Sequence, residues 1–256
     1  MNLRPTPTPL PALADDIARW QQTSYGRGLS VLAQREVAQR VPELFGRHFL
    51  QIGEWDHEHD WLASAVTLNR AVLAVERHHE AACRVDPAAL PFTARSIDAV
   101  LLPHTIERVP SAHGLLREVS RVLSDRGHLM MIGFNPWGAL AWRRRMGLAP
   151  KQMPAQRQWY SAGRVIDWLK LLGFEVLMVR RFGYGFPWMA PREDRGRLEI
   201  ATLAARLSDA YVIHARKRVA PLNRIGQTRI AKVRTLVPVP VAGRISQTRQ
   251  PADRDS

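Results

Sequence analysis

The sequence predicts an α/β fold in which helices cover both faces of a mainly parallel β-sheet. Six short apolar runs of strand length recur along the chain, and amphipathic stretches with helical spacing separate several of them. This alternation is typical of parallel sheets, whose strands are buried on both faces by crossover helices. The chain has 256 residues, of which 46% are hydrophobic, and this is enough for one large core.

The N-terminal part is expected to begin with a flexible segment, 1–19, because its first residues are rich in proline and threonine. Apolar positions at roughly helical spacing then predict a helix over 29–43. The run 48–52 predicts a buried strand that is ended by Gly53. A polar stretch follows, and 62–70 is compatible with a second helix.

The remaining elements follow in order along the chain. Two stripes of apolar residues at helical spacing predict helices, over 115–123 and over 165–172. The further predicted strands are 71–75, 97–102, 128–132, 174–179 and 210–215. In sheets of this class ligands bind at the carboxyl ends of the strands, so candidate site residues should follow the first four strands.

Basic residues outnumber acidic ones by 37 to 23, which gives a formal net charge of +14. Such a charge favours nucleic acids, anionic membrane surfaces or acidic substrates as partners. Ten of the basic residues lie after residue 215, in a stretch rich in proline and arginine, and residues 1–215 carry only +6. We therefore predict a globular domain over 20–218 and a basic, disordered C-terminal tail over 219–256.

The composition also bounds the cellular context. Cys83 is the single cysteine, which excludes an internal disulfide and a cysteine-based zinc site. The first residues lack the apolar core of a signal peptide, and no stretch approaches the ~20 apolar residues that cross a bilayer. These features predict a cytoplasmic protein. The acidic and histidine-rich run 56–60 is expected to be a polar loop and not a metal site, because no second cluster converges on it.

One block of the sequence carries an ordered set of motifs. It contains Asp86 before a Leu-Pro-Phe triplet, Asp98 within an apolar strand, an Arg-Val-Leu triplet at 121–123, and Gly127. In this order the motifs resemble the class I S-adenosylmethionine-dependent methyltransferases of the type 11 group. The chain also resembles the YafS-like methyltransferases at 133–136, 167–169, 174–177 and 215–218, and this resemblance covers most of 20–222.

The resemblance implies a three-layer, Rossmann-like sheet of seven strands, with helices on both faces and the last strand, 210–215, antiparallel. It also implies an enzyme that uses S-adenosylmethionine as its methyl donor and needs no metal. The acceptor would be a small or amphipathic molecule.

Five site residues follow from the resemblance, position by position. Gly53 falls at the first glycine of the cofactor loop. Glu76 falls where an acidic residue accepts both ribose hydroxyls, a task that suits the two oxygens of a carboxylate. Asp86 would face the adenine amino group, with Ala88 beside the ring. His104 falls where residues approach the methionine part of the cofactor and the acceptor, so it is a candidate general base; the alternative is a packed histidine that caps the following turn.

The cofactor loop departs from the family pattern Asp-x-Gly-x-Gly-x-Gly. Gln51 replaces the acidic residue, and Trp55 and His57 replace two glycines that let backbone approach the cofactor. Bulky side chains at these positions are expected to occlude the methionine part or to reshape the loop.

Aromatic residues gather after the strand 128–132, where the superfamily builds its acceptor pocket. They suit a flat or apolar acceptor, or they simply cover the sheet. The arginines at 143–145 beside them are suited to a phosphate or an anionic headgroup, or form a solvated basic face. These aromatic residues are Trp137, Trp142, Trp159, Tyr160, Tyr184 and Trp188.

The leading functional prediction is methyl transfer from S-adenosylmethionine to a small or amphipathic acceptor. A non-enzymatic alternative is a binding module that keeps the methyltransferase fold, which the side chains of Trp55 and His57 favour. A third possibility is methylation of tRNA or rRNA, in which the basic tail would hold the nucleic acid by its charge.

Overall fold

The structure is a computed structural model that describes residues 19–55, 60–75, 83–147, 158–183 and 208–218. All of these residues belong to one compact unit, which ends at Ala220. Apart from Arg19, the predicted N-terminal segment and the predicted basic tail lie outside the described residues, and so do Glu76 and His57. The domain boundaries therefore stay predictions.

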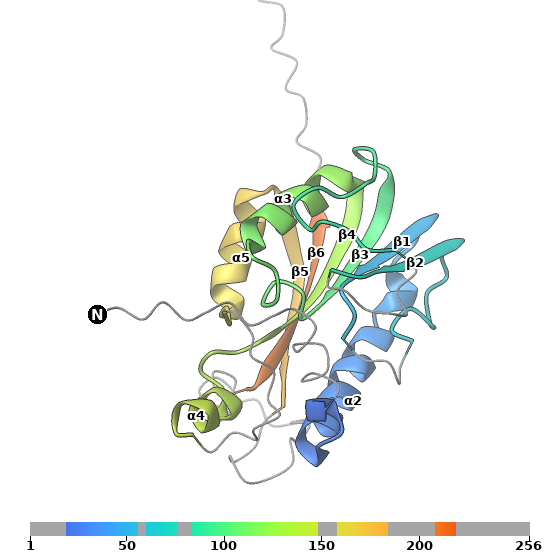
Figure 1. The fold of residues 1–256 in the computed structure, drawn as a ribbon. Helices are drawn as coiled ribbons and strands as arrows, with labels where there is room; N and C mark the ends of the chain where they lie inside the picture. The colour runs from blue at the N-terminus through green and yellow to red at the C-terminus, as the bar shows by residue number, and fades with distance from the viewer. Residues whose placement is uncertain (1–18, 56–59, 76–82, 148–157, 184–207, 219–256) are drawn as a thin grey trace, which may run out of the picture. The chain divides into compact units, whose positions relative to one another are not determined.

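Six strands form one sheet in the order β2-β1-β3-β4-β6-β5 (Figure 1). The first four strands pair in parallel, and β6 lies antiparallel between β4 and β5. The predictions of a mainly parallel sheet and of an antiparallel last strand are therefore confirmed. The strands are β1 (His48–Ile52), β2 (Asn69–Leu73), β3 (Ile97–Pro103), β4 (Leu123–Phe134), β5 (Phe174–Phe182) and β6 (Ala210–Lys217).

The edge of the sheet at β2 differs from the expectation. β2 begins two residues before the predicted run, with the exposed Asn69 and Arg70, which an apolar pattern cannot reveal. Beyond β2 the described residues form one isolated parallel bridge, between Ala74 and Arg84, and no further strand. The described sheet therefore has six strands where the resemblance predicts seven.

Three of the helices begin where a serine or threonine side chain accepts a backbone hydrogen bond. Thr23, Ser111 and Ser161 each accept from the N–H group three residues further on, at 3.1, 3.0 and 3.4 Å. The helix predicted over 29–43 starts earlier and ends at Ala38, because Pro42 disfavours a continued α-helix and Val41–Glu43 forms a 3₁₀ turn. The helices are α2 (Ser24–Ala38), α3 (Ala112–Val122), α4 (Ala139–Arg145) and α5 (Ala162–Leu171).

The helix predicted over 62–70 is wrong. Asp60 Oδ1 accepts from Leu62 N–H at 2.9 Å, and Arg70 Nη1 donates to the Leu62 carbonyl at 2.8 Å. The two side chains bond to a backbone N–H and a backbone carbonyl that a helix would pair with other backbone groups. They therefore favour a turn over a helix. Asn69 then joins the sheet, since its N–H donates to the Arg47 carbonyl at 2.8 Å.

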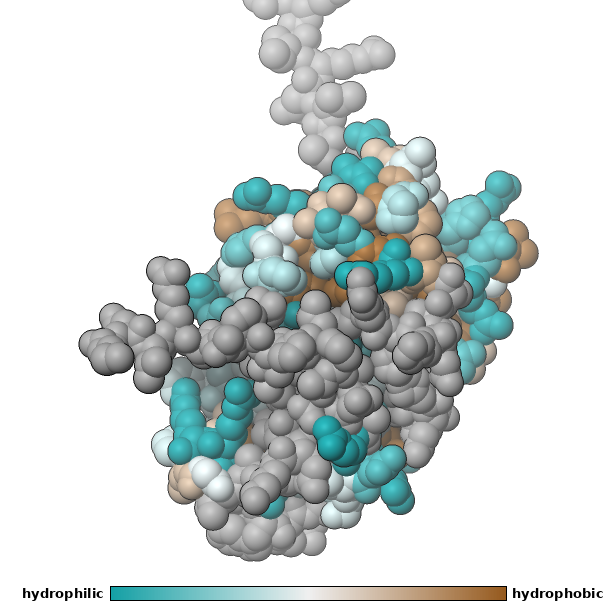
Figure 2. Space-filling model, viewed as in Figure 1, coloured by the Kyte–Doolittle hydropathy of each residue, from teal (hydrophilic) through white to brown (hydrophobic). Residues whose placement is uncertain are grey.

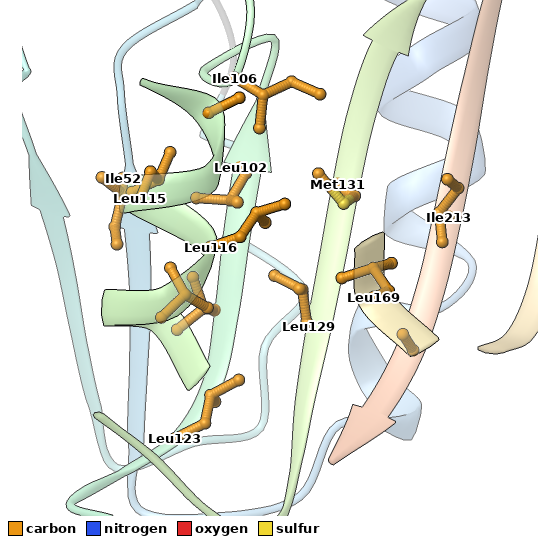
Figure 3. Packing of buried hydrophobic residues seen from close by; sticks show 14 of the residues in the cluster. Ile52, Leu102, Ile106, Leu115, Leu116, Leu123, Leu129, Met131, Leu169 and Ile213 are labelled. Carbon is orange, nitrogen blue, oxygen red and sulfur yellow. The ribbon is translucent and has the colours of Figure 1, made fainter. Parts of the chain in front are cut away.

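Two apolar clusters fill the space between the sheet and its helices. On β1, Leu50 and Ile52 belong to the cluster under α3 and α5, whereas the intervening Phe49 belongs to the cluster under α2 and α4. Figure 3 shows the first cluster, with α3 and α5 in front of the strands and α2 behind them, as in Figure 1. Helices on both faces are therefore confirmed. In the described part of the chain, no helix is long and apolar enough to cross a membrane.

A histidine pair across β4 and β6 makes the stability of the fold depend on pH. His128 Nδ1 lies 2.9 Å from His214 Nε2, and burial together with the nearby His128 lowers the pKa of His214 from 6.5 to about 4. A lowered folded-state pKa contributes stability that is fully present above pH 6.5 and is lost as the pH falls through about 4.

We expect this loss to be about 2 kcal/mol in the wild-type chain and to be absent in His214→Gln, which keeps a polar side chain that does not titrate. Urea denaturation between about pH 7 and pH 4 measures the free energy of unfolding of both proteins. The same pH dependence in the two proteins would contradict the assignment.

Candidate functional site

The loop after β1 begins with Gly53, whose φ of +90° lies in the left-handed region. A Cβ at this position would lie 2.7 Å from Thr105 Oγ1, in the turn after β3. Thr105 Oγ1 in turn donates to the Ile52 carbonyl at 2.5 Å. Any larger residue in place of Gly53 would therefore strain the backbone and displace Thr105. The glycine stands where the sequence predicts it, at the carboxyl end of β1.

Trp55 folds into the protein and covers His104. The indole is 2% exposed, and its ring centroid lies 4.0 Å from that of His104 at an interplanar angle of 34°. His104 also lies against Phe134, at a centroid distance of 4.1 Å, and Trp55 and Phe134 contact each other at 5.6 Å. Trp20 packs edge-on against both Trp55 and Phe134, at 5.8 Å from each. The imidazole, 1% exposed, is thus buried against an indole and a phenyl ring.

A buried carboxylate, Glu107, orients the imidazole of His104. Its Oε2 lies 3.1 Å from His104 Nδ1, and its Oε1 accepts the backbone N–H of Phe134. The side chain is fully buried, so both oxygens need such partners. When Nδ1 carries the proton, it donates a hydrogen bond to the carboxylate. This tautomer of the imidazole leaves a lone pair on Nε2 that can accept a proton. Sequence reasoning missed Glu107, although its position three residues after His104, in one turn, is a signal that was available.

Two more side chains hold the loop after β1. Arg108 donates to the Glu54 carbonyl, and Gln21, which precedes α2, donates to the Trp55 carbonyl. Their partners lie more than thirty residues away along the chain. No local sequence pattern therefore predicts these two hydrogen bonds. Together they fix the backbone on either side of the residue that carries the buried indole.

Asp86 and Ala88 lie in an exposed turn after the Ala74–Arg84 bridge. Asp86 Oδ1 accepts the N–H of Ala88 at 2.8 Å, a local side-chain turn that fixes both residues. The described contacts join Gly53 to His104 through Thr105 and Trp55, but they do not include Asp86 or Ala88. Glu76 and His57 lie outside the described residues, so their roles stay predictions.

A short helix, α4, follows β4, and a buried aspartate anchors it. Asp209 Oδ1 accepts the N–H of Leu140 at 2.6 Å, and Oδ2 accepts the hydroxyl of Tyr25 from α2. Burial raises the pKa of Asp209 to about 6. A Cβ on Gly138 would lie 2.5 Å from the Ser208 carbonyl, so only glycine allows this close approach. The sequence did not predict α4, because its apolar residues are too few for a helical stripe.

Aromatic rings lead from His104 towards α4. Phe134, which packs against both His104 and Trp55, stacks on Trp159 at a centroid distance of 5.1 Å. The guanidinium of Arg144 lies over the ring of Trp159, 5.5 Å from its centroid. Tyr184 and Trp188, which the sequence also assigns to the acceptor side, lie outside the described residues. The described part of this region therefore combines stacked rings with positive charge.

S-adenosylmethionine, the cofactor that the resemblance implies, fits this arrangement only in part. The positive φ of Gly53 and the exposed carboxylate of Asp86 agree with the positions that the resemblance gives them. The methionine part, however, is expected beside His104, where Trp55 packs against the imidazole. The described conformation does not accept the methionine part there, and the indole must leave before a cofactor can contact His104.

Comparison with known proteins agrees with the fold and with the motifs. A family model described as "Methyltransferase domain" matches residues 54–131. The chain is 33% identical over 221 residues to the protein named "Uncharacterized protein YafS" of Escherichia coli (strain K12), a match that covers 86% of this chain and 88% of that protein.

Solved structures show the same fold. A S-adenosylmethionine-dependent methyltransferase of Thermotoga maritima, described as a possible histamine N-methyltransferase, has a TM-score of 0.54 and 17% identity, over 80% of this chain and 97% of that chain. One from Archaeoglobus fulgidus has a TM-score of 0.55 and 14% identity, over 78% of this chain and 96% of that chain. The long match shows that the chain belongs to one family with YafS. Together with the methyltransferase model over 54–131, it places the chain among the class I S-adenosylmethionine-dependent methyltransferases, whose fold the solved structures share.

Proposed function

We propose that this methyltransferase acts on an oxygen or nitrogen atom of a small or amphipathic acceptor, and that His104 takes up the proton that the acceptor loses. The observation that carries this proposal is the 3.1 Å contact between Glu107 Oε2 and His104 Nδ1. It supports the tautomer whose Nε2 can accept a proton, and a positioned imidazole is the commonest general base in enzymes. Glu107 acts through His104 and is therefore a positioning residue.

The aromatic rings between His104 and α4 support the choice of acceptor. Phe134 and Trp159 are stacked, which suits an apolar or flat molecule. Arg144, over the far ring, suits an anionic group on the same molecule. An acceptor with an apolar body and an anionic end fits this order of side chains.

We assign the adenosine part of the cofactor to the four residues that the resemblance gives for it. Gly53 would approach it through backbone, and Glu76 would accept the ribose hydroxyls. Asp86 and Ala88 would lie beside the adenine. The exposure of Asp86 and Ala88 is compatible with this assignment, and the family resemblance supports it.

His104→Gln is expected to lower the rate of methyl transfer by about 100-fold or more, because glutamine cannot take up a proton at neutral pH. Glu107→Gln should lower the rate less, since it can still accept the Phe134 N–H but no longer favours the tautomer. The measurement is transfer of radiolabelled methyl groups from S-adenosylmethionine to the aqueous and organic fractions of a cell extract.

His113→Gln is the matched control, because His113 stacks on Trp168 beside α5, away from His104. This variant should match the wild-type rate. The pH profile supplies a second readout. The rate of the wild-type chain is expected to rise with pH, and loss of the base should remove this rise. Wild-type rates and an unchanged pH profile in His104→Gln would refute the assignment of the base.

A further inference from the structure

Large apolar side chains project from α4 and from the turn before it. Trp137 is 58% exposed, Trp142 48% and Met146 54%. Trp142, Arg145 and Met146 are spaced three and four residues apart, so they share one side of the helix. Arg145 also lies over the ring of Trp137, 5.8 Å from its centroid. We call the group formed by Trp137, Trp142, Arg145 and Met146 the α4 surface.

The sequence on either side of α4 carries charge of a single sign. Between Asp125 and Asp167 the sequence contains seven arginine and lysine residues and not one acidic residue. Arg144 and Arg145 are exposed in the structure. Figure 2 shows hydrophilic side chains next to pale and apolar ones over α4. A patch with this composition attracts an anionic surface and presents side chains that prefer to leave water.

The α4 surface is held firmly on the fold. Leu140 and Ala141 are buried under the helix, and Asp209 binds the N–H of Leu140. The exposed tryptophans therefore lie on a segment that is packed in place. Their exposure is fixed by the packing of the opposite side of the helix.

We propose that the α4 surface docks this protein onto membranes that contain anionic phospholipids. Tryptophan side chains favour the headgroup region of a bilayer, and methionine contributes apolar area just below it. Arginines at the same level pair with lipid phosphates. RNA fits less well, because the guanidinium of Arg145 covers one face of Trp137 and leaves less of the ring for a stacked base. The proposal does not rest on the proposed acceptor, since docking requires neither His104 nor turnover.

The test is co-sedimentation of the full chain with vesicles, either of phosphatidylcholine alone or of phosphatidylcholine and phosphatidylglycerol in equal parts. We expect binding to the anionic vesicles only. Trp137→Ala with Trp142→Ala should weaken this binding by about tenfold or more, and Arg145→Gln, made separately, by about fivefold. Because every variant keeps the basic C-terminal tail, any contribution of the tail is the same in all of them.

Matched control variants change exposed residues on other helices. Leu171→Ala removes an exposed apolar side chain of α5, and Arg27→Gln with Arg117→Gln removes exposed charges of α2 and α3. These variants should bind like the wild-type chain. Equal loss in the controls, or no loss in the α4 variants, would overturn the proposal. Absence of vesicle binding together with α4-dependent binding of a tRNA probe would overturn it in favour of a nucleic-acid surface.

Discussion

Trp55→Gly is expected to bind S-adenosylhomocysteine about tenfold or more tightly than the wild-type chain does. The indole stacks on His104 and packs against Trp20 and Phe134. Burial of such a side chain stabilises the closed loop by roughly 3 kcal/mol. The ligand can contact His104 only in those protein molecules in which the indole has moved away from the imidazole. Its apparent affinity is therefore reduced in proportion to the fraction of such molecules. Glycine removes the competing ring. Isothermal titration calorimetry of both proteins measures the difference.

Trp20→Ala is the matched control for this result. Trp20 is as deeply buried as Trp55 and belongs to the same aromatic cluster, but it does not stack on His104. Both variants should lose roughly 3–5 kcal/mol of stability, because each leaves a cavity. Only the Trp55 variant should gain affinity. If it is too unstable to purify, Trp55→Leu keeps an apolar side chain while shrinking the ring. Unchanged or weaker affinity in both Trp55 variants would show that the indole does not compete with the ligand.

Asp209→Ala is expected to lower the free energy of unfolding by about 3 kcal/mol or more. The carboxylate accepts the N–H of Leu140 and the hydroxyl of Tyr25, and alanine leaves both buried donors without this acceptor. Three elements meet at this group: the start of β6, the start of α4 and α2. Urea denaturation of the variant and the wild-type chain measures the difference.

Two further variants separate the role of Asp209 from a general effect of removing charge. Asp125→Ala removes an exposed carboxylate that pairs with Arg95 at 3.6 Å, and it should cost less than about 1 kcal/mol. Tyr25→Phe removes one of the two donors and should cost less than Asp209→Ala. A loss in Asp209→Ala no larger than that in Asp125→Ala would contradict the anchoring role.

The sequence predicted the strands best where burial dominates. The run 48–52 matches β1 because its apolar residues pack on both faces of the sheet. The helix expected over 62–70 failed because side chains of Asp60 and Arg70 hold the polar groups of a turn, which hydrophobic spacing does not register. The early start of β2 has a related cause, since its first residues are exposed and polar.

The candidate site was predictable only in part. Gly53 and His104 could be placed because each follows a recognisable strand. Glu107 meets His104 only through the geometry of the turn after β3. Its contact with the Phe134 N–H joins this turn to β4, which lies far along the chain. The inward position of Trp55 depends on bonds from Arg108 and Gln21, which come from distant parts of the chain. The roles of Glu76, Asp86 and Ala88 stay predictions.

The central claim is that this chain binds S-adenosylmethionine although a tryptophan stands in its glycine loop. Calorimetric titration of the purified full chain with S-adenosylmethionine and S-adenosylhomocysteine tests it most directly. We predict saturable binding of both ligands to the wild-type chain. No heat of binding for either ligand up to the millimolar range, in the wild-type chain and in Trp55→Gly alike, would contradict the claim.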